Sequence, residues 1–340
     1  MTLSVGVIGL GVMGAEHLRL LREETAGVQV TAICDADPDR AARLTEDASF
    51  FADPMALIAS DKVEAVVIAS PDATHADLAL ACLAAEKHAL CEKPLATSAV
   101  EALQVVDAEV ALGRRLLQIG YMRRFDPAYV EMKRVADEGG IGSPVLLHNV
   151  HRNAAAPDWF TGPMAVTNSF VHEIDISRWL LGSDLVSAIV HSAPGGDPLL
   201  ITMETDKGQI VSTEVFMNAH YGYHVHAQLV GRTGTVQMAQ PSATVTNSGL
   251  HHGHEWPENW VPRFRNAYRV QMTAWVKSVA TGSPAGASAW DGYVATAVAE
   301  QVVTALQTGT KAKLFSAHDL RFTPDSSKLS RNVPCQSALP

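Results

Sequence analysis

The sequence predicts an α/β protein with two domains, an N-terminal doubly wound parallel sheet and a C-terminal α+β domain with a large open antiparallel sheet. A glycine-rich turn joins the first apolar run to a helix pattern, strands and helices alternate through the first third, and β-rich segments follow. The 340 residues, 47% hydrophobic, exceed what one core usually holds. We predict domains at residues 1–122 and 123–320 and a polar tail at residues 321–340.

The composition points to a small-molecule ligand. The net charge of −10 and the absence of Lys/Arg clusters argue against nucleic acid and anionic membrane surfaces as partners. No apolar run approaches the ~20 residues that span a bilayer. The four cysteines show neither CxxC pairing nor zinc-ligand spacing, so we expect reduced thiols in a cytoplasmic protein without a metal.

The segment GLGVMG, residues 9–14, has the glycine spacing of a dinucleotide-binding turn. A β-branched run precedes it and an amphipathic helix pattern follows, as this motif requires. Gly9 permits the tight turn, Gly11 lets the backbone approach a pyrophosphate, and Gly14 lets helix and strand pack closely. With Val12 and Met13, these glycines are predicted to bind the phosphates at the helix N-terminus, as in a Rossmann domain.

Asp35 ends the next strand pattern, residues 28–34, at the distance where an acidic residue meets the adenine ribose. A carboxylate there accepts hydrogen bonds from the 2′-hydroxyl and repels a 2′-phosphate, which favours NAD over NADP. Arg40 keeps NADP as an alternative, and a turn or helix cap before Pro38 is the alternative role for Asp35.

Two polar segments, SPDATH at residues 70–75 and CEKP at residues 91–94, follow the next strand patterns. Ligands bind parallel sheets at the carboxyl ends of the strands. The predicted cofactor contacts at these ends are Ser70, Thr74, His75, Glu92 and Lys93. Lys93 would project toward the nicotinamide, although a solvated lysine at a strand end is the simpler alternative.

The second half contains long β-rich segments between residues 143 and 238. The stretches DKGQ, residues 206–209, and GRTG, residues 231–234, are typical of hairpin turns. They predict an antiparallel sheet, and one of its faces needs cover from helices or another subunit.

Residues 167–182, TNSFVHEIDISRWLLG, form a helix pattern with a polar stripe. Asn168, His172, Asp175 and Trp179 share one face by i, i+3 and i+4 spacing. Buried polar groups without partners cost roughly 1–3 kcal/mol each, so this stripe needs a hydrogen-bond network or a ligand. Taken alone, His172 fits a satisfied core or surface histidine better than a catalytic one.

These segments together resemble the Gfo/Idh/MocA oxidoreductase family. The resemblance rests on GLGVMG, Asp35, CEKPLA, GYMRRFDP, VHRN and HEIDISRWLLG, and extends over about the first 310 residues. Within the family, the chain is most similar to NAD-dependent inositol 2-dehydrogenases. The resemblance implies a Rossmann domain and a second domain whose open sheet makes subunit contacts on its outer face, and therefore a homotetramer or homodimer.

The resemblance also implies roles for residues in both domains. Lys93 would hydrogen-bond the hydroxyl being oxidised, and His172 would accept its proton while hydride leaves for the nicotinamide. His151, Arg123 and Tyr223 or Tyr221 would bind other hydroxyls of a cyclic polyol. Asn168 stands where the inositol enzymes usually carry an aspartate, so it keeps an acceptor but loses a charge.

Several alternatives remain. Asn168 is also consistent with a sugar or glycoside dehydrogenase of the same family. A non-enzymatic NAD-binding sensor would be expected to lose Lys93 or His172, and an enzyme with tightly held NAD would fail to release reduced cofactor. The histidine-rich segment GLHHGHEW, residues 249–256, lacks HExxH and is better explained as a polar surface loop than as a metal site.

Overall fold

The computed structural model describes residues 2–239 and 245–314, so the predicted tail at residues 321–340 lies outside the described residues. Within them, the chain divides into two compact units, each described here by itself. The first comprises residues 2–121 and 268–296, and the second comprises residues 122–239, 245–267 and 297–314. Both units are therefore built from separate stretches of sequence.

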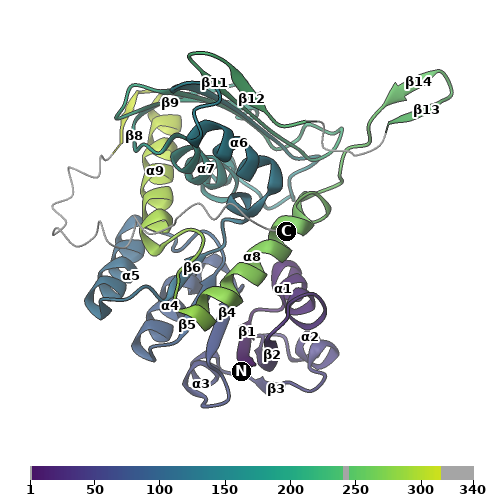
Figure 1. Ribbon diagram of the computed structural model, residues 1–340, viewed down its shortest axis with the longest axis vertical. Helices are drawn as coiled ribbons and strands as arrows, with labels where there is room; N and C mark the ends of the chain where they lie inside the picture. The colour runs from purple at the N-terminus through teal and green to yellow at the C-terminus, as the bar shows by residue number, and fades with distance from the viewer. Residues whose placement is uncertain (1, 240–244, 315–340) are drawn as a thin grey trace. The chain divides into compact units, whose positions relative to one another are not determined.

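The first unit contains the doubly wound parallel sheet that the sequence predicts (Figure 1). Its six strands lie in the order β3-β2-β1-β4-β5-β6. Their bounds are Leu3–Ile8 for β1, Val28–Cys34 for β2, Ser49–Phe51 for β3, Ala65–Ile68 for β4, His88–Cys91 for β5 and Leu117–Ile119 for β6. The helices that follow β1 to β5 in turn are α1 (Val12–Glu23), α2 (Pro38–Leu44), α3 (Pro54–Ala59), α4 (His75–Ala84) and α5 (Ala99–Leu112).

Helices cover both faces of this sheet. On one face, Val5 and Val7 of β1 share a core with α1, α2 and Trp275 of α8 (Trp260–Thr281). Helices α3, α4 and α5 cover the other face and pack against one another in that order. Helix α3 lies so close to β1 that a Cβ added to Gly6 would be 2.6 Å from Leu57. Right-handed crossovers to either side of β1 produce this division.

Proline and aspartate fix the starts of several helices. Asp37, Asp53 and Asp126 each cap a helix whose next residue is proline, and each carboxylate accepts backbone N–H groups of the first turn. Ser98 and Glu101 form a reciprocal capping box at the start of α5. The residue that caps α2 before Pro38 is Asp37, and Asp35, for which a helix cap was the alternative role, lies two residues earlier.

The second unit is built on a seven-stranded sheet in the order β12-β11-β7-β10-β9-β8-β15. Its strands are β7 (Pro144–Arg152), β8 (Leu185–Ser192), β9 (Leu199–Thr205), β10 (Ile210–Phe216), β11 (His224–Gly231), β12 (Thr235–Gln237) and β15 (Ala312–Lys313). DKGQ joins β9 to β10 and GRTG joins β11 to β12, which confirms both predicted hairpins. The sheet is mixed rather than wholly antiparallel, because β7 and β10 are parallel neighbours.

Four α-helices of the described residues belong wholly or partly to this second unit: α6 (Pro127–Asp137), α7 (Val171–Leu181), the start of α8 (residues 260–267) and the later part of α9 (Ala289–Thr308). Along β7, buried Leu147, Asn149 and His151 alternate with the exposed His148. The buried row packs against α7, so β7 places His151 on the helix-covered face.

The histidine-rich segment forms part of a small hairpin between β13 (Thr246–Ser248) and β14 (His251–Gly253). Its side chains are largely exposed, and Leu250 lies at the turn. In the described part of the chain, no group of three or more His, Cys, Asp or Glu side chains could hold a metal ion. Among the described helices, none combines the length and the apolar character needed to cross a membrane.

Candidate active site

The glycine turn of the first unit has the shape that a bound pyrophosphate requires. Gly9 has a φ of +84°, and a Cβ there would lie 2.5 Å from the backbone nitrogen of Ser70. A Cβ on Gly14 would lie 1.8 Å from the carbonyl oxygen of Gly9, so helix α1 starts against the turn. At Gly11 an added Cβ meets nothing within 4 Å, and the neighbouring Val12 is 69% exposed. The turn is therefore tightly packed at Gly9 and Gly14 and leaves space beside the backbone of Gly11, where a pyrophosphate binds in such turns.

Asp35 lies just after β2, beside this turn. Its Oδ2 accepts the Leu10 N–H at 2.6 Å, and its Oδ1 accepts the Asp37 N–H at 2.8 Å. Arg40 Nη1 lies 3.2 Å from Oδ1. Burial by itself would raise the pKa of Asp35, but the two N–H groups and the Arg40 guanidinium hold it below its usual value. The carboxylate is therefore ionised at neutral pH and can still accept hydrogen bonds from a ribose diol.

The ends of β4 and β5 carry the other predicted cofactor contacts. Ser70 and Thr74 join their hydroxyls at 2.6 Å at the exposed end of β4. His75 and Glu92 are buried and turn toward protein partners, the carbonyl oxygen of Pro94 for His75 and the imidazole of His17 for Glu92. Contact of the last two with NAD stays a prediction.

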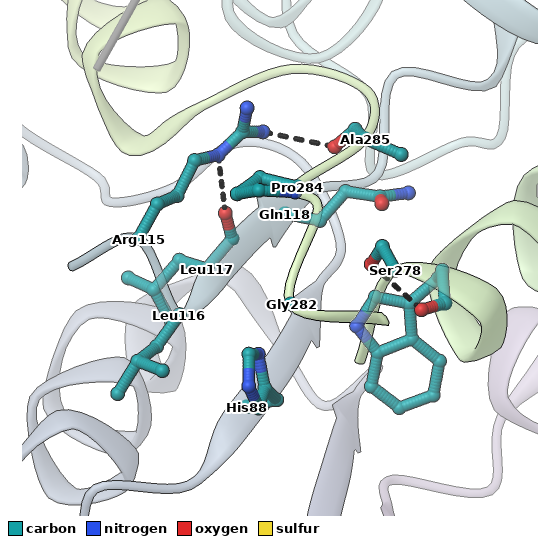
Figure 2. Close-up of a pocket in the computed structure, with 10 residues that line it drawn as sticks. His88, Arg115, Leu116, Leu117, Gln118, Ser278, Gly282, Pro284 and Ala285 are labelled. Atoms are coloured by element: carbon teal, nitrogen blue, oxygen red, sulfur yellow. Dashed lines mark hydrogen bonds between the residues drawn. The ribbon is translucent and has the colours of Figure 1, made fainter. Parts of the chain in front are cut away.

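A small pocket of the first unit lies away from these strand ends (Figure 2). His88, the first residue of β5, and Leu117, the first residue of β6, line it together with Trp275 and Pro284. Arg115 donates to the carbonyl oxygens of Leu117 and Ala285 beside it. Because ligands of such sheets bind at the carboxyl ends of strands, this pocket at the amino ends is not the candidate site.

The polar helix of the second unit is not one regular α-helix. Residues Ala165–Phe170 form a π-helical stretch, called η3, and α7 continues from Val171. Asn168 lies in η3, where its Oδ1 accepts the Thr167 hydroxyl at 3.0 Å. His172 lies in the first turn of α7 and is 8% exposed. Wide turns of this kind are rare and often occur at functional sites, and the sequence did not predict this one.

Asp175, the third member of the predicted polar stripe, is satisfied within the protein. Both its carboxylate oxygens accept from Arg124, at 2.5 and 3.0 Å. Of the two alternatives that the sequence left for the polar stripe, a hydrogen-bond network or a ligand, Asp175 has the first. Trp179, farther along α7, lies under the ammonium group of Lys133 at 5.9 Å from the ring centroid.

Two buried side chains, Arg123 and Glu173, contact the Nδ1 atom of His151. Arg123 pairs with Glu173, and these residues are 1% and 0% exposed. His151 Nδ1 lies 3.1 Å from Glu173 Oε2 and 3.2 Å from Arg123 Nη2. Burial by itself would raise the pKa of Glu173, but the charges of Arg123 and His151 lower it. Sequence reasoning missed Glu173, whose position beside His172 in the HEID segment was the available signal.

Tyr223, rather than Tyr221, lies with this group. The Tyr223 ring meets His151 edge-on at 5.8 Å between centroids, and the rings of His151 and His172 are 6.5 Å apart. Burial raises the pKa of Tyr223 to about 12, so its hydroxyl stays protonated. Tyr221 instead bonds His224 and Arg152. The second unit thus gathers the predicted residues Arg123, His151, His172 and Tyr223.

We expect Glu173→Gln to destabilise the second unit strongly. Removing one charge of a fully buried ion pair typically costs about 3–5 kcal/mol, because the other charge stays buried without compensation. The matched control is Glu214→Gln, which breaks the half-exposed Arg152–Glu214 pair and should cost about 0–1 kcal/mol. Thermal unfolding by calorimetry measures both, and equal transition temperatures for the two variants would contradict this expectation.

The comparisons with known proteins agree with both units. A model described as "Oxidoreductase family, NAD-binding Rossmann fold" matches residues 3–121, and one described as "Oxidoreductase family, C-terminal alpha/beta domain" matches residues 133–314. Inositol 2-dehydrogenase 1 of Saccharopolyspora erythraea is 50% identical over 326 residues, covering 92% of this chain and 97% of the relative. Inositol 2-dehydrogenase of Agrobacterium fabrum is 39% identical over 320 residues, covering 91% and 95%.

One solved structure extends this likeness to the fold. The crystal structure of myo-inositol dehydrogenase from Lactobacillus casei in complex with NAD(H) and myo-inositol has a TM-score of 0.90 and 30% sequence identity, covering 95% of this chain and 99% of that one. The fingerprint turn, the strand-end lysine and the polar helix thus occur in a chain that aligns with such enzymes over more than nine-tenths of its length. The protein belongs to the Gfo/Idh/MocA family of oxidoreductases.

Proposed function

We propose that this protein oxidises a ring hydroxyl of an inositol to the ketone with NAD, as an inositol 2-dehydrogenase. The 50% identity to inositol 2-dehydrogenase 1 over nearly all of both chains carries this proposal. The buried polar group around His151 and His172 supports it, because a cyclic polyol needs several hydrogen-bonding partners at once.

The residues of the first unit fit NAD. The open backbone at Gly11 would bind the pyrophosphate, and the ionised Asp35 would accept hydrogen bonds from the adenosine ribose. When bound, NAD accepts the hydride that leaves the substrate carbon. The chain itself binds the cofactor, orients it at the strand ends and supplies the groups that handle the proton.

Lys93 and His172 are proposed to act on the reacting hydroxyl. Lys93, half-buried directly after β5, would donate a hydrogen bond to the hydroxyl oxygen and stabilise the negative charge that develops there. His172 would accept the hydroxyl proton, a step for which imidazole is suited near neutral pH. The two roles are complementary, because His172 would remove the hydroxyl proton while Lys93 would stabilise the negative charge on the hydroxyl oxygen.

The other polar side chains of the second unit are proposed to bind the remaining hydroxyls. His151 and Tyr223 present imidazole and phenol groups beside His172, and Asn168 offers an amide four residues before it. Arg123 was predicted to contact substrate as well. Because its guanidinium is fully buried on Glu173, we propose that it acts by holding Glu173 and His151.

Asn168 favours a second candidate substrate class. An amide accepts and donates hydrogen bonds without charge, so it cannot stabilise an imidazolium at His172 as a carboxylate would. A sugar or glycoside oxidised at a ring hydroxyl would use the same lysine and histidine. The test is formation of NADH by purified protein given NAD with a panel of inositols, aldoses and glycosides. We expect the highest kcat/KM with an inositol, and activity confined to aldoses or glycosides would replace the inositol proposal.

Asp35→Asn should weaken NAD use and permit NADP. The variant loses a charged acceptor for the ribose, an interaction worth about 1.5–3 kcal/mol, so kcat/KM for NAD should fall at least tenfold. It also removes the repulsion of a 2′-phosphate and releases Arg40 to pair with it, so kcat/KM for NADP should rise. The exposed Asp39 of α2 gives the control Asp39→Asn, which should leave both values unchanged. Equal use of both cofactors by the wild type would contradict this role for Asp35.

A further inference from the structure

Two buried histidines of the first unit bracket the turn that carries Lys93. On one side of Lys93, His17 Nε2 lies 2.7 Å from Glu92 Oε1. On the other side, His75 Nδ1 lies 2.7 Å from the carbonyl oxygen of Pro94. His17 and His75 are 0% and 1% exposed, so both contacts are shielded from water. We call residues 92–94 the lysine turn.

The two contacts reach the lysine turn from opposite faces of the parallel sheet. His17 belongs to α1, which packs with Leu90 of β5 in the core shared with α8. His75 begins α4, which packs on the other face with α3 and α5. Gly120 adds a third constraint, because a Cβ there would lie 2.8 Å from the Glu92 carboxyl group. The lysine turn is therefore contacted from both faces of the sheet and, at Glu92, by Gly120 after the neighbouring strand β6.

His75 is held at both ring nitrogens. Its second nitrogen, Nε2, lies 2.8 Å from the carbonyl oxygen of Ser70, so each ring nitrogen faces a carbonyl oxygen. The ring therefore links Pro94, in the lysine turn, to Ser70 at the end of β4.

His17 donates a hydrogen bond to the carboxylate of Glu92. Burial by itself would raise the pKa of Glu92, but the hydrogen bond and charge of His17 lower it, so the carboxylate is ionised. An ionised carboxylate only accepts, so the proton lies on His17 Nε2. Glu92 Oε2 also accepts the backbone N–H of Lys93, at 3.3 Å. His17 therefore acts on the backbone of Lys93 through Glu92.

We infer that His75 and His17 are positioning residues that hold Lys93 where the reaction needs its ammonium group. This inference rests on the proposed function of Lys93. Catalysis by positioned groups is sensitive to geometry, and a displacement of ~1 Å can cost about 10²-fold in rate. Neither histidine touches the substrate; each acts through the lysine turn.

The first test separates positioning from cofactor binding. His75→Gln keeps a polar side chain but offers N–H groups from one nitrogen only, so it can serve one of the two carbonyls. We expect kcat to fall by about 10²-fold while KM for NAD and the affinity for NADH change little. His17→Phe should lower kcat similarly, and His17→Gln, which keeps a donor for Glu92, should recover most of it. The control is His88→Gln, at the opposite end of β5, with unchanged kcat.

Titration with NADH counts the folded sites in each variant, so a loss of folded protein is not mistaken for a loss of kcat. A kcat within twofold of wild type for both His75→Gln and His17→Phe would overturn the inference. A fall in NADH affinity that matches the fall in kcat would also overturn it, because the histidines would then serve cofactor binding rather than Lys93.

The second test does not depend on turnover. We expect the backbone amide signal of Lys93 in a ¹⁵N NMR spectrum to shift in His75→Gln and in His17→Phe and to stay in place in His88→Gln. An unchanged Lys93 signal in both variants would overturn the inference, because the lysine turn would then not depend on either histidine. Shifts of this signal in an enzyme that oxidises no inositol would refute the proposed substrate while supporting the positioning.

Discussion

Lys93→Met should lower kcat for inositol oxidation by about 10²–10³-fold, the usual effect of removing one donor that stabilises a developing oxyanion. Methionine keeps the length of the side chain and removes its charge. The fingerprint turn and Asp35 are untouched, so NADH should bind with nearly wild-type affinity. Steady-state kinetics with NAD and myo-inositol, together with a fluorescence titration of NADH, measure both quantities.

The control for this variant is Lys62→Met. Lys62 is an exposed lysine of the same unit and is remote in sequence from the lysine turn, so the same chemical change should leave kcat unaffected. If Lys93→Met retains more than a tenth of the wild-type kcat, Lys93 does not stabilise the reacting oxygen. The simpler interpretation, a solvated lysine at a strand end, would then hold.

His172→Asn should lower kcat by about 10²–10⁴-fold at neutral pH, the range that general base catalysis supplies. Asparagine can still hydrogen-bond a hydroxyl but cannot accept its proton at neutral pH. Part of the activity should return at high pH, where hydroxide can take the proton. The dependence of kcat on pH for wild type and variant measures this effect. The part of the wild-type profile that is due to protonation of His172 should be absent from the profile of the variant.

A second histidine of the same unit provides the control. His148 lies on β7 three residues before His151, but its side chain is exposed on the opposite face of the sheet. His148→Asn should therefore leave the pH profile unchanged. A His172→Asn enzyme with the wild-type profile would show that another group accepts the proton, and the neighbouring His151, backed by Glu173, would be the next residue to replace.

The features predicted from sequence are those that short segments determine. Within the six-residue glycine turn, Gly9 has a positive φ, and a Cβ on Gly14 would lie 1.8 Å from the carbonyl oxygen of Gly9. The DKGQ and GRTG hairpins depend on a few turn residues between strand patterns. Asp35 follows from its spacing to the fingerprint. Each of these signals is readable without knowing what packs against it.

Features that depend on distant residues were not predicted. The stretch containing Asn168 is π-helical although its sequence is compatible with a regular α-helix, which is what the sequence predicted. Residues 268–296 return to the first unit because Trp275 fills the core beside β1 and α1. Burial of Glu173 against Arg123 joins residues 50 positions apart. In the last two cases the determining contact is between segments far apart in the chain.

The roles of His75 and Glu92 show the same limit. Their positions at strand ends predicted cofactor contact, which stays a prediction, while the structure shows how their side chains are held by Pro94, Ser70 and His17. A strand-end position identifies the neighbourhood of a ligand. It does not distinguish a residue that touches the ligand from one that supports a residue that does.

We expect this chain to transfer the hydrogen on the alcohol carbon of an inositol to NAD. The most direct measurement uses myo-inositol deuterated at C2, with NAD as acceptor, and mass spectrometry of the reduced cofactor. We predict that the NADH formed carries one deuterium per turnover and that kcat falls with the deuterated substrate if hydride transfer limits the rate. Unlabelled NADH, or no NADH from any inositol, would contradict the account.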